Sequence, residues 1–160
     1  MNIEQFYQPS GNSCGPTCLF MVKEYLFNHT DSAERTLEKN NFIIDEISEL
    51  CGTDWVVGTP PDRMIKGMNC LGMKFVEYQS SPRPFQLLRT VIENNNIPIL
   101  RTITKGVPHW IIVTGYIGFD FQINDPWQGK IIYSEKELND IWECRQYQFF
   151  ELIDSRIEIC

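Results

Sequence analysis

The spacing of apolar residues changes near the middle of the chain. Before about residue 73 they recur every three or four positions, as on the buried face of a helix; after it they alternate with polar residues or form short runs, as in strands. The predicted helices span 14–28, 30–50 with a break near 40–41, 60–71, 84–95 and 134–142. The predicted strands span 73–78, 97–103, 109–115, 119–123, 130–133 and 146–153. Helices followed by mostly antiparallel strands predict an α+β fold.

Local signals sharpen some of these boundaries. Ser134 with Glu137 three positions later forms a capping-box pattern that starts the last helix. The segment 51–59 reads as a loop that exposes a large aromatic side chain, and 80–84 as a loop rather than a domain boundary. With 160 residues and no internal repeat, the chain predicts a single domain over 1–160.

Composition and charge narrow the classes of partner. The net charge is -7 and no block of lysine or arginine occurs, so neither nucleic acid nor an anionic membrane is an expected partner. No apolar run approaches the roughly 20 residues of a membrane helix, and the first residues lack the features of a secretory signal. We therefore expect a cytoplasmic protein, with delivery by a non-classical secretion route left open.

The cysteines and histidines argue against a bound metal. The six cysteines are scattered and no Cys-x-x-Cys occurs, so we expect reduced thiols rather than a disulfide framework. Only two histidines are present, which gives a structural zinc site poor support, and no cofactor is expected. Cys14 and Cys18 share a helical face, but Cys18 is interpreted as helix core.

The segment 8–18, QPSGNSCGPTC, places Cys14 where a loop becomes a helix. Gly15 and Pro16 suit a first helical turn, and the apolar face that follows is the set Leu19, Phe20, Val22, Leu26 and Phe27. Unpaired N–H groups at a helix start favour a thiolate over a thiol and can also bind an oxyanion. Taken alone, however, such a cysteine is more often a small buried apolar residue.

A nucleophilic cysteine needs a base, and the chain offers one candidate. His29 lies about 22 Å along the helix from Cys14 at about 1.5 Å per residue, which is out of reach. His109 is the remaining histidine, at the start of a strand directly after Pro108. It is therefore the expected general base.

Two further residues would complete a site. If the chain reverses near Ile117, antiparallel pairing sets His109 opposite Asp125, close enough for the carboxylate to orient the imidazole. The alternative is an ordinary polar pair at a strand edge. Gln8, six positions before Cys14, can add a side-chain N–H to the backbone N–H of Cys14 in an oxyanion site, although a lone glutamine usually faces solvent.

These motifs resemble a known family. The chain is similar to papain-like cysteine peptidases, and within them to the branch of double-glycine leader peptidases that mature bacteriocins and their stand-alone bacterial relatives. The resemblance runs from about residue 5 to 129, with the family's intervals of six and sixteen residues, and rests on Gln8, Cys14-Gly15-Pro16, Pro108-His109-Trp110 and Asn124-Asp125-Pro126. It implies a papain-like fold in which the cysteine helix packs against a sheet carrying the histidine and aspartate.

The resemblance also implies roles: Cys14 as nucleophile, His109 as base and later acid, Asp125 as its orienter and Gln8 as oxyanion donor. The expected function is hydrolysis of a peptide or isopeptide bond in a peptide or protein substrate. The same triad could instead serve a transamidase or a glutamine deamidase, or the module could be inactive and bind a protein partner. The residues expected to line a substrate cleft are Trp55, Trp110 and Trp127.

Overall fold

The protein is an α+β fold around one antiparallel sheet, here in a computed structural model that describes residues 1–27 and 35–156. The six strands lie in the order β1-β6-β2-β3-β4-β5, and each neighbouring pair is antiparallel. Their bounds are β1 (Phe75–Tyr78), β2 (Ile97–Thr104), β3 (Val107–Ile117), β4 (Asp120–Asp125), β5 (Gly129–Ser134) and β6 (Phe149–Leu152).

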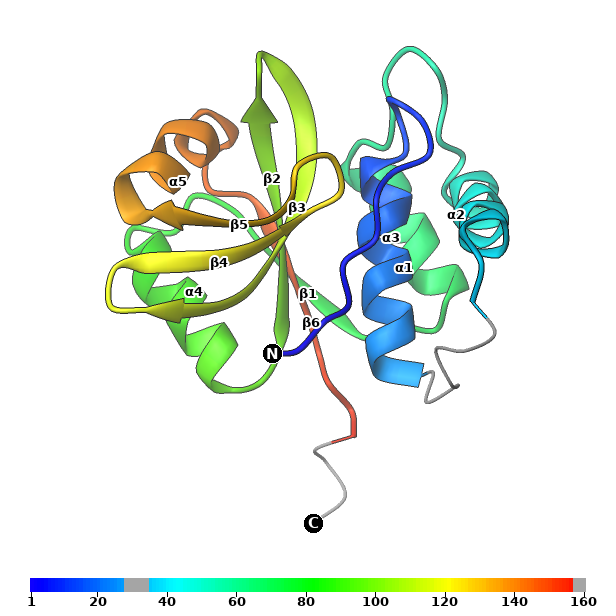
Figure 1. The fold of residues 1–160 in the computed structure, drawn as a ribbon. Helices are drawn as coiled ribbons and strands as arrows, with labels where there is room; N and C mark the ends of the chain where they lie inside the picture. Colours follow the sequence, from blue (N-terminus) through cyan, green and yellow to red (C-terminus); the bar gives the residue numbers. More distant parts are fainter. Residues whose placement is uncertain (28–34, 157–160) are drawn as a thin grey trace.

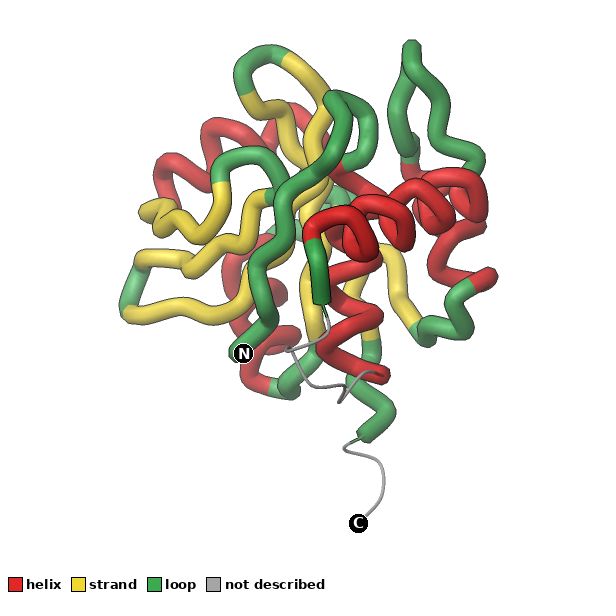
Figure 2. The backbone as a smooth tube through the Cα atoms, turned by 45° about the vertical axis from the view of Figure 1, so that its right-hand side comes forward, coloured by secondary structure: helices red, strands yellow, loops and turns green. Residues whose placement is uncertain are grey.

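Helices cover both faces of the sheet (Figures 1 and 2). One side carries α1 (Cys14–Phe27), α2 (Leu37–Cys51) and α3 (Pro61–Cys70); the other carries α4 (Pro84–Glu93) and α5 (Glu135–Trp142), which leads into the short 3-10 helix η2 (Glu143–Arg145). Because both faces are covered, the segment 110–113 of β3 is apolar throughout rather than alternating. Its even-numbered residues join the α1 side and its odd-numbered residues the α4 side.

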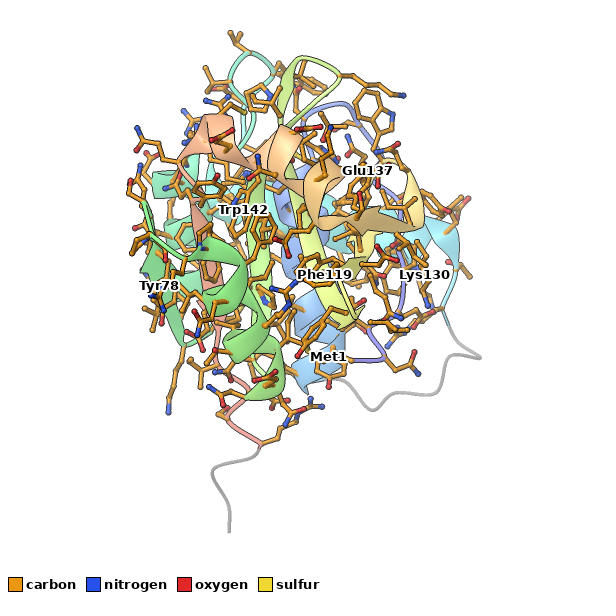
Figure 3. All side chains as sticks on the ribbon, turned by 90° about the vertical axis from the view of Figure 1, so that its left-hand side faces the viewer. Met1, Tyr78, Phe119, Lys130, Glu137 and Trp142 are labelled. Atoms are coloured by element: carbon orange, nitrogen blue, oxygen red, sulfur yellow. The ribbon has the colours of Figure 1, made fainter. Side chains whose placement is uncertain are left out.

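The side of α4 and α5 has an aromatic core. Trp142, labelled in Figure 3, is fully buried, and its indole meets the ring of Phe85 from α4 edge-on at a centroid distance of 5.7 Å. Its indole N–H donates to the carbonyl of Gln148 at 3.0 Å, so the one polar atom of this ring is satisfied. This layer supports the sheet from the face opposite α1.

Most predicted elements are confirmed within a few residues, including the capping box of Ser134 and Glu137 that starts α5. The second helix differs, because α2 begins at Leu37 with Thr36 as its cap and runs without a break through 40–41. The predicted start of that helix at 30–32 and His29 lie outside the described residues. Phe27 was predicted to be buried and is half exposed, at the last residue of α1.

The expected register between β3 and β4 is wrong. These strands pair Ile117 with Asp120 around a tight turn at Gly118, whose φ is 62°, and a bulge between Val113 and Gly115 then shifts the pairing by one residue. At the far end Ile112 pairs with Asn124, so one step further Asp125 falls opposite residue 111 instead of 109. The pattern of apolar residues does not reveal where such a bulge lies, so the sequence could not predict this shift.

The segment 1–13 has no regular structure and runs between the sheet and α1 (Figure 1). Hydrogen bonds tie it to β3, β4 and the turn that follows: Met1 N to Thr114 O, Asn124 Nδ2 to Ile3 O, Gln5 Nε2 to Asp125 O and Gln8 N to Pro126 O. It therefore reaches the start of α1 along a fixed path. None of the helices in 1–27 and 35–156 is both long and apolar enough to cross a bilayer.

Candidate active site

Cys14 is the first residue of α1, as the loop-to-helix signals predict. Ser13 holds the turn before it: its Oγ donates to Ser10 O at 3.0 Å and accepts from Ser10 N at 3.1 Å. The Cys14 side chain is 7% exposed and lines a pocket. In this first turn Pro16 has no N–H and the Thr17 N–H donates to Ser13 O at 2.9 Å. The N–H groups of Cys14 and Gly15 have no acceptor within the helix, and such groups can bind an oxyanion.

Gly15 allows α1 to begin this close to its neighbours. A Cβ added at this position would lie 2.7 Å from Met64 Sδ and 3.0 Å from Thr59 Cβ. Real Cβ contacts are longer than this, so only glycine fits without a shift of α1, α3 or the loop before it. The glycine after Cys14 therefore sets the position of the thiol relative to α3.

His109 and Asp125 meet across β3 and β4, although they are not directly opposed. The imidazole Nε2 lies 2.8 Å from Asp125 Oδ1, and both side chains are buried. The contact is a diagonal one, of the kind that neighbouring antiparallel strands allow on one face. The predicted partnership is thus present in a register two residues away from the expected one.

The imidazole is also influenced by the side chain of Cys14, which is one of the groups that raise its pKa. Since Nε2 is engaged by Asp125, the nitrogen left for the thiol is Nδ1. Burial lowers the pKa of His109, but the interactions with Asp125 and Cys14 outweigh it and raise the pKa to about 9. The imidazole is therefore protonated at neutral pH while it contacts the carboxylate.

Asp125 is held by more than His109. Its Oδ1 accepts the backbone N–H groups of Trp127 at 2.7 Å and Gln128 at 3.1 Å, and its Oδ2 accepts from Gln128 Nε2 at 3.1 Å. Burial raises the pKa of Asp125, but the bonds from His109 and from the two backbone N–H groups outweigh it and keep the pKa below its ordinary value. The carboxylate is therefore ionised and fixed in orientation.

Gln128 is a positioning residue that our sequence reasoning missed. Besides Asp125, its amide nitrogen contacts Tyr133 Oη at 3.2 Å. An aspartate followed by Pro126 is a turn-forming signal in which the carboxylate accepts backbone N–H groups two and three residues on, and this signal could have indicated the 125–128 turn. Gln5, which donates to the carbonyl of Asp125, carries no such signal.

Gln8 lies beside the site on the segment 1–13. Its Nε2 donates to Ser10 O at 2.7 Å, and its Oε1 is buried without a hydrogen-bond partner among the described residues. The amide nitrogen has a second hydrogen that this bond does not use. Gln8 and His109 line the same pocket. The role of Gln8 as oxyanion donor stays a prediction.

Two adjoining pockets open at this end of the molecule, where Figure 1 shows the loop of 8–13, the 52–60 loop and the tip of the β2–β3 hairpin on the same side of the fold. They share Gly11, Val107 and Pro108. The first, of about 490 Å³, contains His109 and is called here the His109-side pocket. The second, of about 480 Å³, contains Cys14 and is called the Cys14-side pocket. Together they leave space on either side of the Cys14–His109 contact.

The three tryptophans expected in the cleft have different environments. Trp127 lines the His109-side pocket, with its ring 5.9 Å from that of His109, and Lys105 Nζ lies 4.8 Å from its centroid. Trp110 lines the Cys14-side pocket but is buried, stacks on Phe150, and donates to Thr59 O at 2.7 Å. Trp55 is 83% exposed in the 52–60 loop and lines neither of these two pockets. Their role in substrate binding stays a prediction.

The other thiols differ from Cys14. The cysteines of the described residues are all free, and no group of three potential metal-binding side chains occurs in 1–27 and 35–156. Burial, together with the charges of Cys14 and Asp125, raises the pKa of Cys18, and burial with the charge of Cys70 raises that of Cys51 to about 12. Cys18 and Cys51 are thus protonated thiols at neutral pH. Cys70 and Cys144 are exposed, away from either pocket.

A cysteine at the start of a helix, facing an antiparallel sheet that carries a histidine and an aspartate, is the arrangement of papain-like cysteine peptidases, and the protein is of this class. More particularly, the model of the peptidase C39 family matches residues 2–147, so the chain belongs to that family. The expected papain-like fold is confirmed. A search of curated protein sequences finds no significant match.

Several solved structures share the fold. The peptidase domain of Streptococcus ComA, a bifunctional ABC transporter of a quorum-sensing pathway, is 17% identical with a TM-score of 0.70 over 94% of this chain and 98% of that one. A double-glycine-motif protease from an AMS/PCAT transporter, in complex with its leader peptide, is 16% identical with a TM-score of 0.66 over 95% and 93%. A C39-like peptidase from Bacillus anthracis is 12% identical with a TM-score of 0.67 over 95% and 94%.

Proposed function

We propose that this peptidase hydrolyses a peptide or isopeptide bond through Cys14, His109 and Asp125, with an acyl-enzyme intermediate. The observation that supports it is the buried His109–Asp125 pair, with the Nε2–Oδ1 distance at 2.8 Å, together with the influence of Cys14 on the pKa of the same imidazole. A protonated imidazole between a sulfur and a fixed carboxylate is the arrangement that activates a thiol nucleophile and stores the proton that the leaving group needs.

The chemistry follows from these positions. The Cys14 thiolate attacks the carbonyl carbon, and the oxyanion is stabilised by the Cys14 N–H and the Gln8 amide. As the carbon–nitrogen bond breaks, His109 gives its proton to the leaving amine and the thioester forms. His109 then takes a proton from water and the hydroxide adds to the thioester. The carbon–sulfur bond breaks, the acid product leaves, and the Cys14 thiolate and protonated His109 are restored. Asp125 keeps Nδ1 facing the sulfur throughout.

The substrate is proposed to be a peptide or protein segment. The two pockets flank the Cys14–His109 contact, so a chain can lie across the nucleophile with residues on both sides. One of the structural neighbours was solved with a leader peptide bound, which supports a peptide substrate for a chain of the same fold. No observation favours an amine over water as the acceptor of the acyl group.

The experiment is competitive alkylation with iodoacetamide at mildly acidic pH, with the modified cysteines identified by mass spectrometry. Cys14 should react at least about tenfold faster than the exposed Cys70 and Cys144, because the imidazolium stabilises its thiolate. Cys18 and Cys51 should stay unmodified. His109→Ala should remove the advantage of Cys14. Equal rates for Cys14, Cys70 and Cys144 would contradict the proposal.

Hydrolysis itself is tested on a library of peptides, with cleaved products identified by mass spectrometry. The wild-type protein should produce new termini, and Cys14→Ala should produce none while unfolding at the same temperature. Adding a primary amine separates hydrolysis from transfer, because a transamidase would give amine adducts in place of free acids. A mass increase of one unit at glutamine without chain cleavage would indicate deamidation and contradict the proposal.

A further inference from the structure

Arg101 lines the same pocket as the nucleophile. It lies on β2, directly opposite Trp110 of β3, and both residues line the Cys14-side pocket. Directly opposed residues of antiparallel strands share a face of the sheet, so Arg101 lies on the α1 side with Cys14. The guanidinium is partly buried, as the intermediate exposure of the residue indicates. A cation is thus placed within the cavity that the acyl half of a substrate would occupy.

The charge of Arg101 has no counterion within the described part of the chain. Its Nη1 donates to Gln148 Oε1 at 2.9 Å, and no carboxylate of the described residues lies within 4.0 Å of its nitrogens. A guanidinium has five N–H donors, so most of them have no acceptor among the described residues. Burial and the positive charge of Arg145 both lower the pKa of Arg101. Keeping an unpaired charge partly buried is unfavourable, and binding of an anion to Arg101 would offset this unfavourable free energy.

Unlike Arg101, four other arginines form ion pairs with carboxylates: Arg35, Arg63, Arg89 and Arg156. Arg63, Arg89 and Arg156 each pair with a carboxylate at 2.6–2.7 Å, as an acidic chain of net charge -7 readily allows. Arg101 instead has a second cation nearby, and the Nε of Arg145 is itself buried without a partner among the described residues. The region around Arg101 is therefore electropositive in a protein that is acidic overall.

One hydrogen bond restrains the guanidinium of Arg101. Gln148 accepts from Arg101 through Oε1, and its Nε2 donates to Glu77 at 2.7 Å, which sets the orientation of the amide. The backbone N–H of Arg101 also donates to Gln148 O at 3.1 Å. A cation held in one orientation loses little conformational freedom when it binds an anion, which favours recognition.

The chemistry of the proposed reaction defines which half of the substrate reaches Arg101. The acyl carbon bonds to the Cys14 sulfur, whereas the leaving amine receives its proton from His109. The leaving half therefore extends over the His109-side pocket and the acyl half over the Cys14-side pocket. A terminal carboxylate of the substrate belongs to the leaving half, so the anion that meets Arg101 must be a side chain.

We propose that Arg101 is a specificity-determining residue that binds the carboxylate of an aspartate or glutamate on the acyl side of the scissile bond. This inference rests on the proposed function, because it assumes that Cys14 is the nucleophile. It assigns the substrate class as peptides with an acidic residue in the few positions before the cleaved bond.

The experiment uses peptidyl vinyl sulfones, which place residues on the acyl side only and alkylate the nucleophilic cysteine without any cleavage. Three tripeptide probes carry a glutamate at successive positions in an alanine background, and each has a twin with glutamine. For at least one position the glutamate probe should modify Cys14 about tenfold faster than its twin, since only the charge differs. The ratio should fall as the salt concentration rises.

Variants of Arg101 distinguish a loss of substrate specificity from a general loss of reactivity at the site. Arg101→Gln should lower the rate with the glutamate probe far more than the rate with the glutamine probe, so that the ratio falls to about one; a merely structural role would lower both rates by the same factor and keep the ratio. Arg101→Lys should keep part of the ratio. Arg83→Gln removes the same charge from an exposed position before α4 and should leave the ratio as in the wild type.

Failure of this inference is distinct from failure of the proposed function. If iodoacetamide modifies Cys14 selectively but glutamate and glutamine probes react equally at all three positions, the role of Arg101 is wrong and the nucleophile stands. If Cys14 shows no selective alkylation, both proposals fail. Faster cleavage of peptides with a free terminal carboxylate than of their amides, with equal vinyl sulfone rates, would assign Arg101 to that carboxylate and overturn the inference.

Discussion

The side-chain amide of Gln8 has one polar atom with a hydrogen-bond partner and one without. Its nitrogen donates to Ser10 O at 2.7 Å, whereas its oxygen is buried without a partner among the described residues. A buried unpaired oxygen is unfavourable for folding, so the amide is not placed there for stability. Its place beside His109 in one pocket is explained if the remaining N–H serves the oxyanion.

This role predicts a specific pattern for Gln8→Ala. The turnover number for a cleaved peptide should fall about 10²–10³-fold, as for other oxyanion donors. The rate of Cys14 alkylation by iodoacetamide should not change, because alkylation forms no oxyanion. Gln79→Ala, an exposed glutamine that pairs with Gln146, is the control and should alter neither rate. A parallel loss of both rates would show that Gln8 acts on the thiol and not on the oxyanion.

The sequence predicted His109 and Asp125 correctly as partners, although the argument that joined them used the wrong register. Elimination identified His109, and the spacing of sixteen residues matched a family pattern, but neither depends on the turn. The bulge at 113–115 and the tight turn at Gly118 together shift the pairing by two residues, and a diagonal contact replaces the direct one. Contacts from distant segments, such as Gln5 with the carbonyl of Asp125, leave no local pattern and could not be predicted.

At the scale of elements, α1 is a central helix: most of its residues are buried, on every face of the helix. The sheet, α2 and α3 surround it, and its first turn contacts the loop before α3. Helix positions were predictable because they follow from local spacing and capping residues. The close approach of Gly15 to Met64 was not, since it depends on how two helices distant in sequence pack together.

Gly15→Ala tests this packing. The new Cβ would lie 2.7 Å from Met64 Sδ and 3.0 Å from Thr59 Cβ, so the Met64 side chain, α1 or the loop before α3 must shift, and the free energy of unfolding should fall by about 1–3 kcal/mol. The turnover number should fall as well, because the shift moves Cys14 relative to His109. Gly11→Ala, where a Cβ meets no atom within 4 Å, is the matched control and should change stability little. Chemical denaturation and peptide cleavage measure the two effects; unchanged stability in Gly15→Ala would contradict the argument.

At the scale of the whole molecule, the site joins parts of the fold that are separate in sequence. Cys14 comes from the helical layer and His109 and Asp125 from the sheet, while the segment 1–13 connects them through bonds to β4 and the turn after it. The buried contacts between these parts include charged groups. The stability of the fold should therefore depend on the ionisation of the site itself.

The direction of this dependence follows from His109. Its pKa is raised to about 9 in the folded protein from 6.5, so its contribution to stability is fully present below pH 6.5 and is lost as the pH rises toward 9. The loss should amount to about 3 kcal/mol, since the two pKa values differ by about 2.5 and each pKa unit corresponds to about 1.4 kcal/mol. The pKa of Asp125 is lowered, so its contribution is present above its ordinary pKa near 3.8 and is lost at more acidic pH.

Chemical denaturation of the wild type and of His109→Gln between pH 6 and pH 9.5 measures the effect. The difference in unfolding free energy between the two proteins should shrink steadily across this range, because titrations elsewhere in the chain are common to both and cancel. Asp120→Asn, an exposed carboxylate on the same strand, is the control and should give a constant difference from the wild type. A difference for His109→Gln that is constant or grows with pH would mean that the imidazole is neutral in the folded protein, and a neutral imidazole could not hold the proton for the leaving amine.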